Sequence, residues 1–166
     1  MDAEAVRQLV AESLNATRLK RVGRSRWLSE STDLIWVVEV DRGSAWSSWA
    51  VQLGAVVRQW APDRTSPHAS DGHLYQDYVN HGLGVPPGAE STPYSDHRSY
   101  FSMALDHRRD QISEADRRTA FTYLADELDL LVSTVQTTSQ LAALARSETS
   151  DGAFVDPRLR ELAGQP

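Results

Sequence analysis

The chain of 166 residues contains no cysteine. Disulfide scaffolds, thiolate zinc sites, iron–sulfur clusters and cysteine nucleophiles are therefore excluded. Several motifs are missing as well: the sequence has no nucleophile elbow (GxSxG), phosphate loop (GxxxxGKS or GxxxxGKT), dinucleotide fingerprint (GxGxxG) or HExxH. We therefore expect a protein that needs no cofactor and holds no metal.

Long apolar runs are also absent. No stretch approaches the roughly 20 residues that a membrane helix needs. The first residues, MDAEAVRQLVAESL, lack the basic start and apolar core of a signal peptide. We therefore expect a soluble cytoplasmic protein with no membrane contact, folded as a single domain over residues 1–166.

Charge is distributed unevenly. Residues 1–60 carry eight Lys/Arg against seven Asp/Glu, whereas residues 61–166 carry nine against sixteen, and the total is −6. The cations cluster between Arg18 and Arg26, with no acidic residue among them. Such a cluster could hold phosphate, but a charge run is more often the solvated face of an element. Since the whole chain is acidic, we expect a protein partner rather than nucleic acid.

Hydrophobic spacing predicts two clear helices. Val6, Leu9, Val10 and Leu14 lie on one face of a helix over residues 3–15. Ser113, with Asp116 three residues later, resembles a capping box before a broad apolar stripe that runs from Phe121 to Val135. We also expect a helical turn at 17–22, a short helix at 141–146, and one more turn in the tail at 156–164.

Strand character is found in three early runs, residues 24–29, 34–41 and 48–60, which short polar breaks separate. Connections this short join antiparallel neighbours, because parallel strands need long crossovers. A fourth strand is expected at 99–105, where Phe101, Met103 and Leu105 alternate with small residues. The prediction is an α+β fold: an antiparallel sheet of about four strands, with the N-terminal and C-terminal helices packed on one face.

Residues 61–97 have no periodicity and hold five of the seven prolines. We interpret this segment as a long irregular loop, with a short helix near residues 73–80. Four of the five histidines lie in it or at its end. His68, Asp71 and His73 are types that ligate divalent metals, but their spacing matches no recognised zinc site, and solvated loop histidines are the preferred interpretation.

Two carboxylates two residues apart, Glu39 and Asp41, share a strand face with Ile35 and Val37. A catalytic pair would need a raised pKa and a cleft. Pairing of these carboxylates with Arg24 or Arg26 on the neighbouring strand is the simpler interpretation, so no catalytic residue is assigned.

Five tryptophans are unusual for a chain of this size. Trp36 and Trp49 lie within strands and suit a core. Aromatic residues at strand ends and in the loop, together with arginines of the neighbouring strands, form a candidate binding surface, because exposed aromatics and arginines anchor interfaces. Its members are Trp46, Trp60, Tyr75, Tyr78, Arg24, Arg26 and Arg42.

The first 60 residues resemble the bacterial domain-of-unknown-function family 4304. The positions that carry the resemblance are Leu19, Lys20, Gly23, Arg24, Arg26, Trp27, Arg42, Ser44, Leu53 and Gly54. Arg24 stands where the family usually has an aromatic residue, and Asp41 where it tends to have glutamine. The resemblance implies an α+β arrangement and no established activity.

Two function hypotheses remain. The first is a non-enzymatic protein-binding module of an immunity or regulatory type, favoured by the acidic balance, the missing catalytic motifs and the aromatic residues. The second is a small hydrolase or nucleic-acid-processing enzyme, which would grip phosphate with the basic run and use Glu39 and Asp41, or His68, Asp71 and His73, for acid–base or metal chemistry.

Overall fold

The computed structural model describes residues 1–42, 48–78, 97–147 and 152–164. Its strands form one antiparallel sheet in the order β1-β2-β3-β4-β5-β6, so every neighbour in the sheet is also the next strand in the chain. The strands are β1 (Lys20–Arg21), β2 (Arg26–Glu30), β3 (Leu34–Arg42), β4 (Trp49–Val57), β5 (Leu74–Asp77) and β6 (Phe154–Val155).

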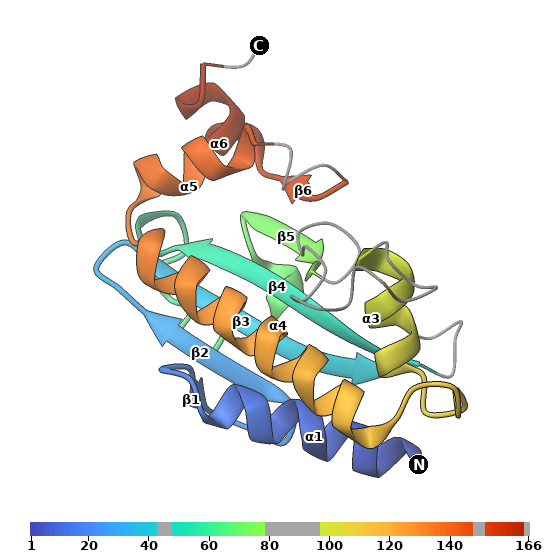
Figure 1. The fold of residues 1–166 in the computed structure, drawn as a ribbon. Helices are drawn as coiled ribbons and strands as arrows, with labels where there is room; N and C mark the ends of the chain where they lie inside the picture. Colours follow the sequence, from blue (N-terminus) through green and yellow to red (C-terminus); the bar gives the residue numbers. More distant parts are fainter. Residues whose placement is uncertain (43–47, 79–96, 148–151, 165–166) are drawn as a thin grey trace.

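Helices cover one face of this sheet, with α1 and α4 lying across it side by side (Figure 1). The helices are α1 (Ala3–Asn15), α3 (His97–Leu105), α4 (Glu114–Thr134), α5 (Thr138–Ala145) and α6 (Pro157–Leu162), with short 3-10 turns η1 (Arg58–Trp60) and η2 (Ala69–Asp71). Each of the five contributes apolar side chains to one large core cluster. Trp27 and Trp36, both fully buried, fill the sheet side of that core.

The predicted antiparallel α+β class is confirmed, and the strongest local patterns fold as expected. Asp2 caps α1, and Ser113 and Asp116 form the capping box of α4. Asp156 caps the helix expected in the tail. The sheet, however, has six strands instead of about four, because the short strands β1, β5 and β6 were not predicted.

The predicted strand at 99–105 is wrong, because this segment is helix α3. Its buried residues Tyr100, Phe101, Ala104 and Leu105 follow the helical spacing of one, three and one, and they belong to the main core cluster. In so short a run, alternation and helical spacing select overlapping positions, so periodicity alone could not decide.

Two other expectations are wrong. The helical turn predicted at 17–22 contains strand β1, which pairs with β2. The helix predicted near 73–80 is strand β5 over its described part, since Leu74–Asp77 pairs with β4 and β6. In both places backbone pairing with a neighbouring strand overrides a weak local pattern.

The second face of the sheet has a smaller cluster, formed by Leu28, Ile35, Val37, Val56 and Ala69. Residues 61–73, which we call the strap, run across it and bring η2 against β3 and β4. In the parts of the chain that the structure describes, no helix is long and apolar enough to cross a bilayer.

Candidate functional site

The strap covers only part of the second face of the sheet. We call the part that it leaves uncovered, on β3 to β6, the open face. Strand register defines it, because directly paired residues point to the same side of a sheet. One row pairs Glu39 with Gln52 and Gln52 with Asp77, and the next row pairs Tyr75 with Phe154. Its members, all exposed or half-buried, are Glu39, Asp41, Ala50, Gln52, Tyr75, Asp77 and Phe154.

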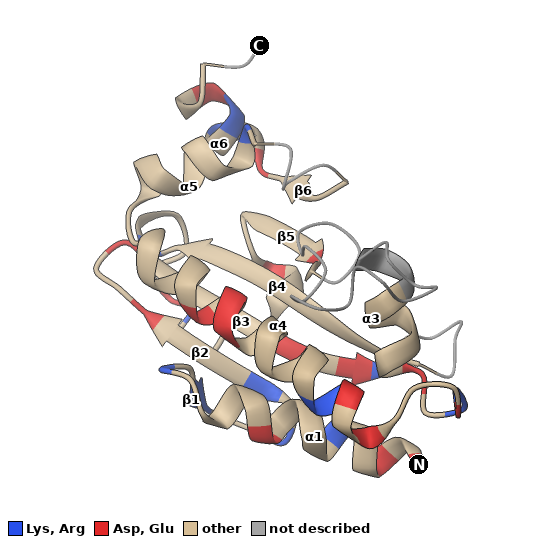
Figure 2. Ribbon diagram, in the orientation of Figure 1, with Lys and Arg blue, Asp and Glu red and all other residues tan. Residues whose placement is uncertain are grey.

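The open face is acidic and aromatic. Figure 2 shows its carboxylates as red segments near the ends of β3 and β5. Phe154 is 57% exposed, which is high for so large an apolar side chain. Burial raises the pKa of the Tyr75 hydroxyl, and the nearby carboxylates of Asp77, Glu39 and Asp41 raise it further. Three negative groups therefore act on one aromatic side chain of this surface.

Glu39 connects the open face to the strap. Its carboxylate accepts a hydrogen bond from the backbone N–H of Ala69 at 3.0 Å and lies 2.7 Å from Nδ1 of His68. The Glu39 side chain is 16% exposed and that of His68 65%. Glu39 therefore holds the strap in place, while Asp41, which is exposed, contributes the more outlying charge.

The three metal-ligand candidates do not converge. The backbone N–H of His68 donates to the Asp71 carboxylate at 2.9 Å, an arrangement that caps η2. His73 is buried, and its ring lies beside Trp60, which packs against the main core. Among the described residues, no group of three His, Asp or Glu side chains could hold a metal ion.

The predicted binding residues are distributed over several places. Tyr75 lies on the open face, and Arg26 lies at the outer end of its acidic row, paired in register with Glu39. The Arg26 guanidinium donates to Ser66 and to the carbonyl of Pro67, and so binds the strap instead of Glu39.

The other predicted binding residues lie away from the open face. Arg24 is in the turn before β2, where it pairs with Glu4 at 3.3 Å. Arg42 lies over the Trp49 ring on the helix-covered side, at 5.7 Å. Tyr78 is buried in the main core, where burial raises its hydroxyl pKa, so it offers no free surface.

Trp60 also has an internal role, since its ring contacts His73 and lies under the guanidinium of Arg158. The remaining candidate, Trp46, lies outside the described residues. Of the six candidates that the structure describes, only Tyr75 and Arg26 therefore lie on the side of the sheet that forms the open face.

Sequence reasoning missed four members of the open face: Ala50, Gln52, Asp77 and Phe154. For Asp77 a signal was present, because Tyr75 and Asp77 share a face when LYQD is interpreted as a strand. Phe154 had no local signal, since its place beside Tyr75 depends on pairing between residues far apart in the chain.

A small cavity of about 100 Å³ lies at the opposite end of β3, lined by Thr32, Asp33, Arg58, Gln59 and Thr138. Its charged groups are already engaged. Asp33 accepts from the backbone N–H of Thr138 at 3.2 Å, and Arg58 pairs with Glu30 and donates to the carbonyl of Ser31. This cavity therefore offers room for a few water molecules rather than for a substrate.

Comparison with known proteins found no match: no family model, no curated protein and no solved structure is similar to this chain. The resemblance to family 4304 therefore stays a prediction.

Proposed function

We propose that this protein is a non-enzymatic binding module, of an immunity or regulatory type, that binds a basic protein through the open face. The observation that carries the proposal is the combination of a cross-strand aromatic pair, half-buried Tyr75 and exposed Phe154, with three carboxylates on the same face of the sheet. Aromatic side chains supply apolar contact area, and surrounding charges steer and orient a partner of opposite sign.

A rigid sheet supports this surface. The strands beneath it, β3 and β4, are the longest in the described parts of the chain and are paired along nine residue pairs. Their other face is buried under the helices. The part of the open face on β3 and β4 is therefore held in one shape, and binding there does not cost the entropy of ordering it.

Charge neutralisation provides the test. In Asp41→Asn/Asp77→Asn we expect the affinity for an oligo-arginine peptide, measured by calorimetry at low salt, to fall about 3- to 30-fold. This range corresponds to the loss of two surface ion pairs at roughly 0.3–1 kcal/mol each. In the native protein the same binding is expected to weaken as salt is added.

The control is Asp126→Asn/Glu161→Gln, which removes the same amount of charge from exposed positions on α4 and α6. It is expected to bind the peptide nearly as tightly as the native protein. Equal losses in the two double variants would show that only net charge attracts the peptide, and the proposal would fail.

The contact between Glu39 and His68 favours a second candidate function, a small hydrolase. A carboxylate that holds Nδ1 leaves the other ring nitrogen of an exposed histidine available as a base. If this function is correct, a panel of phosphoester substrates should reveal turnover in the native protein, and His68→Ala should lose it. A panel without turnover would remove this candidate and leave the binding module.

A further inference from the structure

The segment that carries Phe154 is attached to the sheet through His73. Strand β6 pairs with β5 at only two positions, Leu74 with Val155 and Tyr75 with Phe154. The next link is the backbone N–H of Asp156, which donates to the carbonyl of His73 at 2.7 Å. The C-terminal unit, residues 152–164, also buries Val155, Leu159 and Ala163 in the main core, but so few backbone bonds to the sheet make it a candidate for local opening.

Side chains strengthen the same attachment. The Trp60 ring meets the His73 ring edge-on, with 5.2 Å between centroids. Trp60 also contacts α6, because the guanidinium of Arg158 lies over the Trp60 ring, 4.5 Å from its centroid. A continuous series of contacts therefore leads from His73 through Trp60 to α6.

His73 occupies this position only as a neutral ring. Its Nδ1 accepts a hydrogen bond from the backbone N–H of Val57 at 2.9 Å, and the ring is 8% exposed. A nitrogen that accepts carries no proton, so the ring's single proton lies on Nε2. In the imidazolium form both nitrogens donate, so protonation would set Nδ1–H against the Val57 N–H and displace the ring.

We infer that His73 is a proton-sensitive latch: the neutral ring holds the C-terminal unit against the end of the sheet, and protonation releases that unit. Because Phe154 belongs to the unit, release also removes half of the aromatic pair from the open face. This last consequence rests on the proposed function, whereas the latch itself does not.

The charged groups around the ring act in both directions. Arg158 from α6 and Arg64 from the strap oppose a positive imidazolium, and Asp156 favours it. The Asp156 carboxylate is already bound to Arg158, at 2.9 Å. Burial is the largest influence, so the pKa of His73 in the attached state lies below its ordinary value of 6.5.

The sign of the pH dependence follows from this shift. The released state binds a proton more readily than the attached state, so lowering the pH favours release. Attachment is fully stable above pH 6.5, the ordinary value, and weakens as the pH falls below it towards the lowered pKa of the attached ring.

NMR on the intact labelled protein tests the latch. We expect His73 to titrate with a midpoint below 6.5, and the amide signals of Phe154–Leu162 to change with the same midpoint while those of α1 and α4 stay in place. A midpoint of 6.5 or higher, or signals of all elements changing together, would overturn the latch.

His73→Asn separates titration from structure. The side-chain oxygen of asparagine can take the place of Nδ1 as acceptor but cannot be protonated in this range. The C-terminal signals should then lose their pH response, whereas His68→Asn, at an exposed histidine, should keep it. An unchanged response in a folded His73→Asn protein would refute the latch; if that variant does not fold, the midpoint in the native protein still decides.

Binding distinguishes the latch from the proposed function. The oligo-arginine peptide should bind the native protein more weakly at pH 5.5 than at pH 7.5, and this difference should shrink in His73→Asn. If the peptide does not bind at either pH, the proposed function fails, but the NMR measurement on the protein alone still decides whether the latch exists.

Discussion

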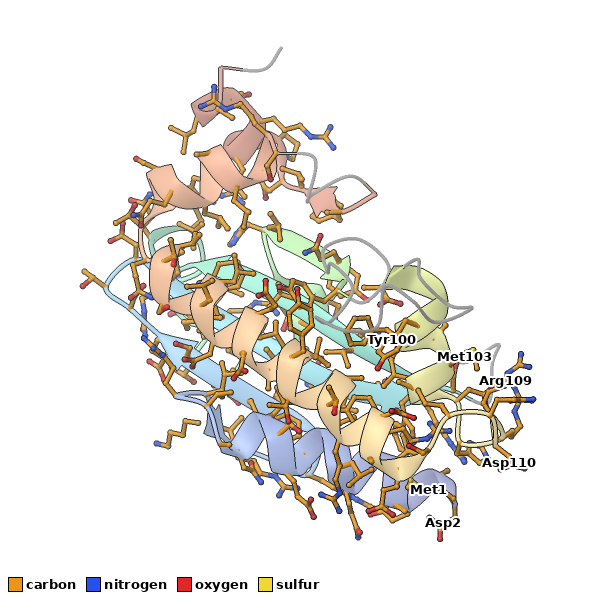
Figure 3. The ribbon with its side chains drawn as sticks, viewed as in Figure 1. Met1, Asp2, Tyr100, Met103, Arg109 and Asp110 are labelled. Carbon is orange, nitrogen blue, oxygen red and sulfur yellow. The ribbon has the colours of Figure 1, made fainter. Side chains whose placement is uncertain are left out.

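Replacing Arg117 by alanine should lower the free energy of unfolding by about 3–5 kcal/mol, the cost typical of removing one member of a buried charged network. Arg117 lies in α4, and only 1% of it is exposed. Its guanidinium donates to four backbone carbonyls, those of Met103, Ala104, Asp106 and Arg109. Met103 lies near the C-terminal end of α3, and Arg109 lies in the loop that follows (Figure 3).

The physical reason is the end of helix α3. The last carbonyls of a helix have no hydrogen-bond partner within the helix and carry partial negative charge. A cation placed there therefore donates the missing hydrogen bonds and also neutralises the partial charge. Burial lowers the pKa of Arg117, while Asp106 and Asp110 counteract that effect. Without the guanidinium, several buried carbonyls would lose their donor, each at a cost of about 1–3 kcal/mol.

The adjacent residue gives the matched control. Arg118 is exposed on α4 and pairs with Glu12 and Glu114, so Arg118→Ala should cost much less stability than Arg117→Ala. Urea unfolding of both variants measures the difference. A loss below about 1 kcal/mol in Arg117→Ala would contradict the role assigned to its guanidinium.

Neighbouring arginines with such different roles show what the sequence could reveal. Arg117 precedes Phe121 by four residues, so it falls on the apolar stripe of α4, whereas Arg118 does not. A charged residue on the buried stripe of a helix indicates a buried polar network, because its charge needs hydrogen-bond partners within the protein. Its partners at the end of α3 were not predictable, since that segment was interpreted as a strand.

The fold was predictable wherever the signal is local. Helices α1 and α4 have complete apolar stripes and capping residues, and strands β2 to β4 are long enough to show β-type composition. Strands β1 and β6 have two residues each and β5 has four, so their existence depends on the neighbours that pair with them. Propensity over so few residues is too weak to reveal them.

The same distinction holds for the candidate site. Glu39 and Asp41 were recognised as sharing a face, because two residues on one strand suffice to place them. The sequence indicates Tyr75 as an aromatic residue of a loop, but it does not reveal the strand to which Tyr75 belongs. The association of Tyr75 with Phe154 requires β5 and β6 to pair, and the contact of Glu39 with His68 requires the strap to cross the sheet. Neither follows from local sequence.

Replacing Gly54 by alanine should displace the strap and lower the free energy of unfolding by about 1–3 kcal/mol, as overpacking does in a well-packed interior. Gly54 lies in β4, under η2. A Cβ at this position would lie 2.2 Å from the carbonyl oxygen of Ala69 and 2.7 Å from its Cα. These are backbone atoms, so no side-chain rotation can relieve the clash, and the strap must move.

The consequence would reach the open face through Glu39. If the strap moves, the bonds from Glu39 to the backbone N–H of Ala69 and to the His68 ring must lengthen or break. Gly54→Ala should therefore change the NMR signals of His68 and of the Ala69 amide, besides reducing stability. Urea unfolding measures the loss, and the two signals show whether the strap is its origin.

Gly23→Ala is the matched control, because a Cβ at Gly23 would meet nothing within 4 Å. It should leave stability unchanged or raise it by up to about 1 kcal/mol, since alanine restricts the unfolded chain. If Gly54→Ala were as stable as this control and kept the His68 and Ala69 signals of the native protein, the strap would not lie directly on β4. The strap would then not mark the edge of the open face, and Glu39 would not anchor it.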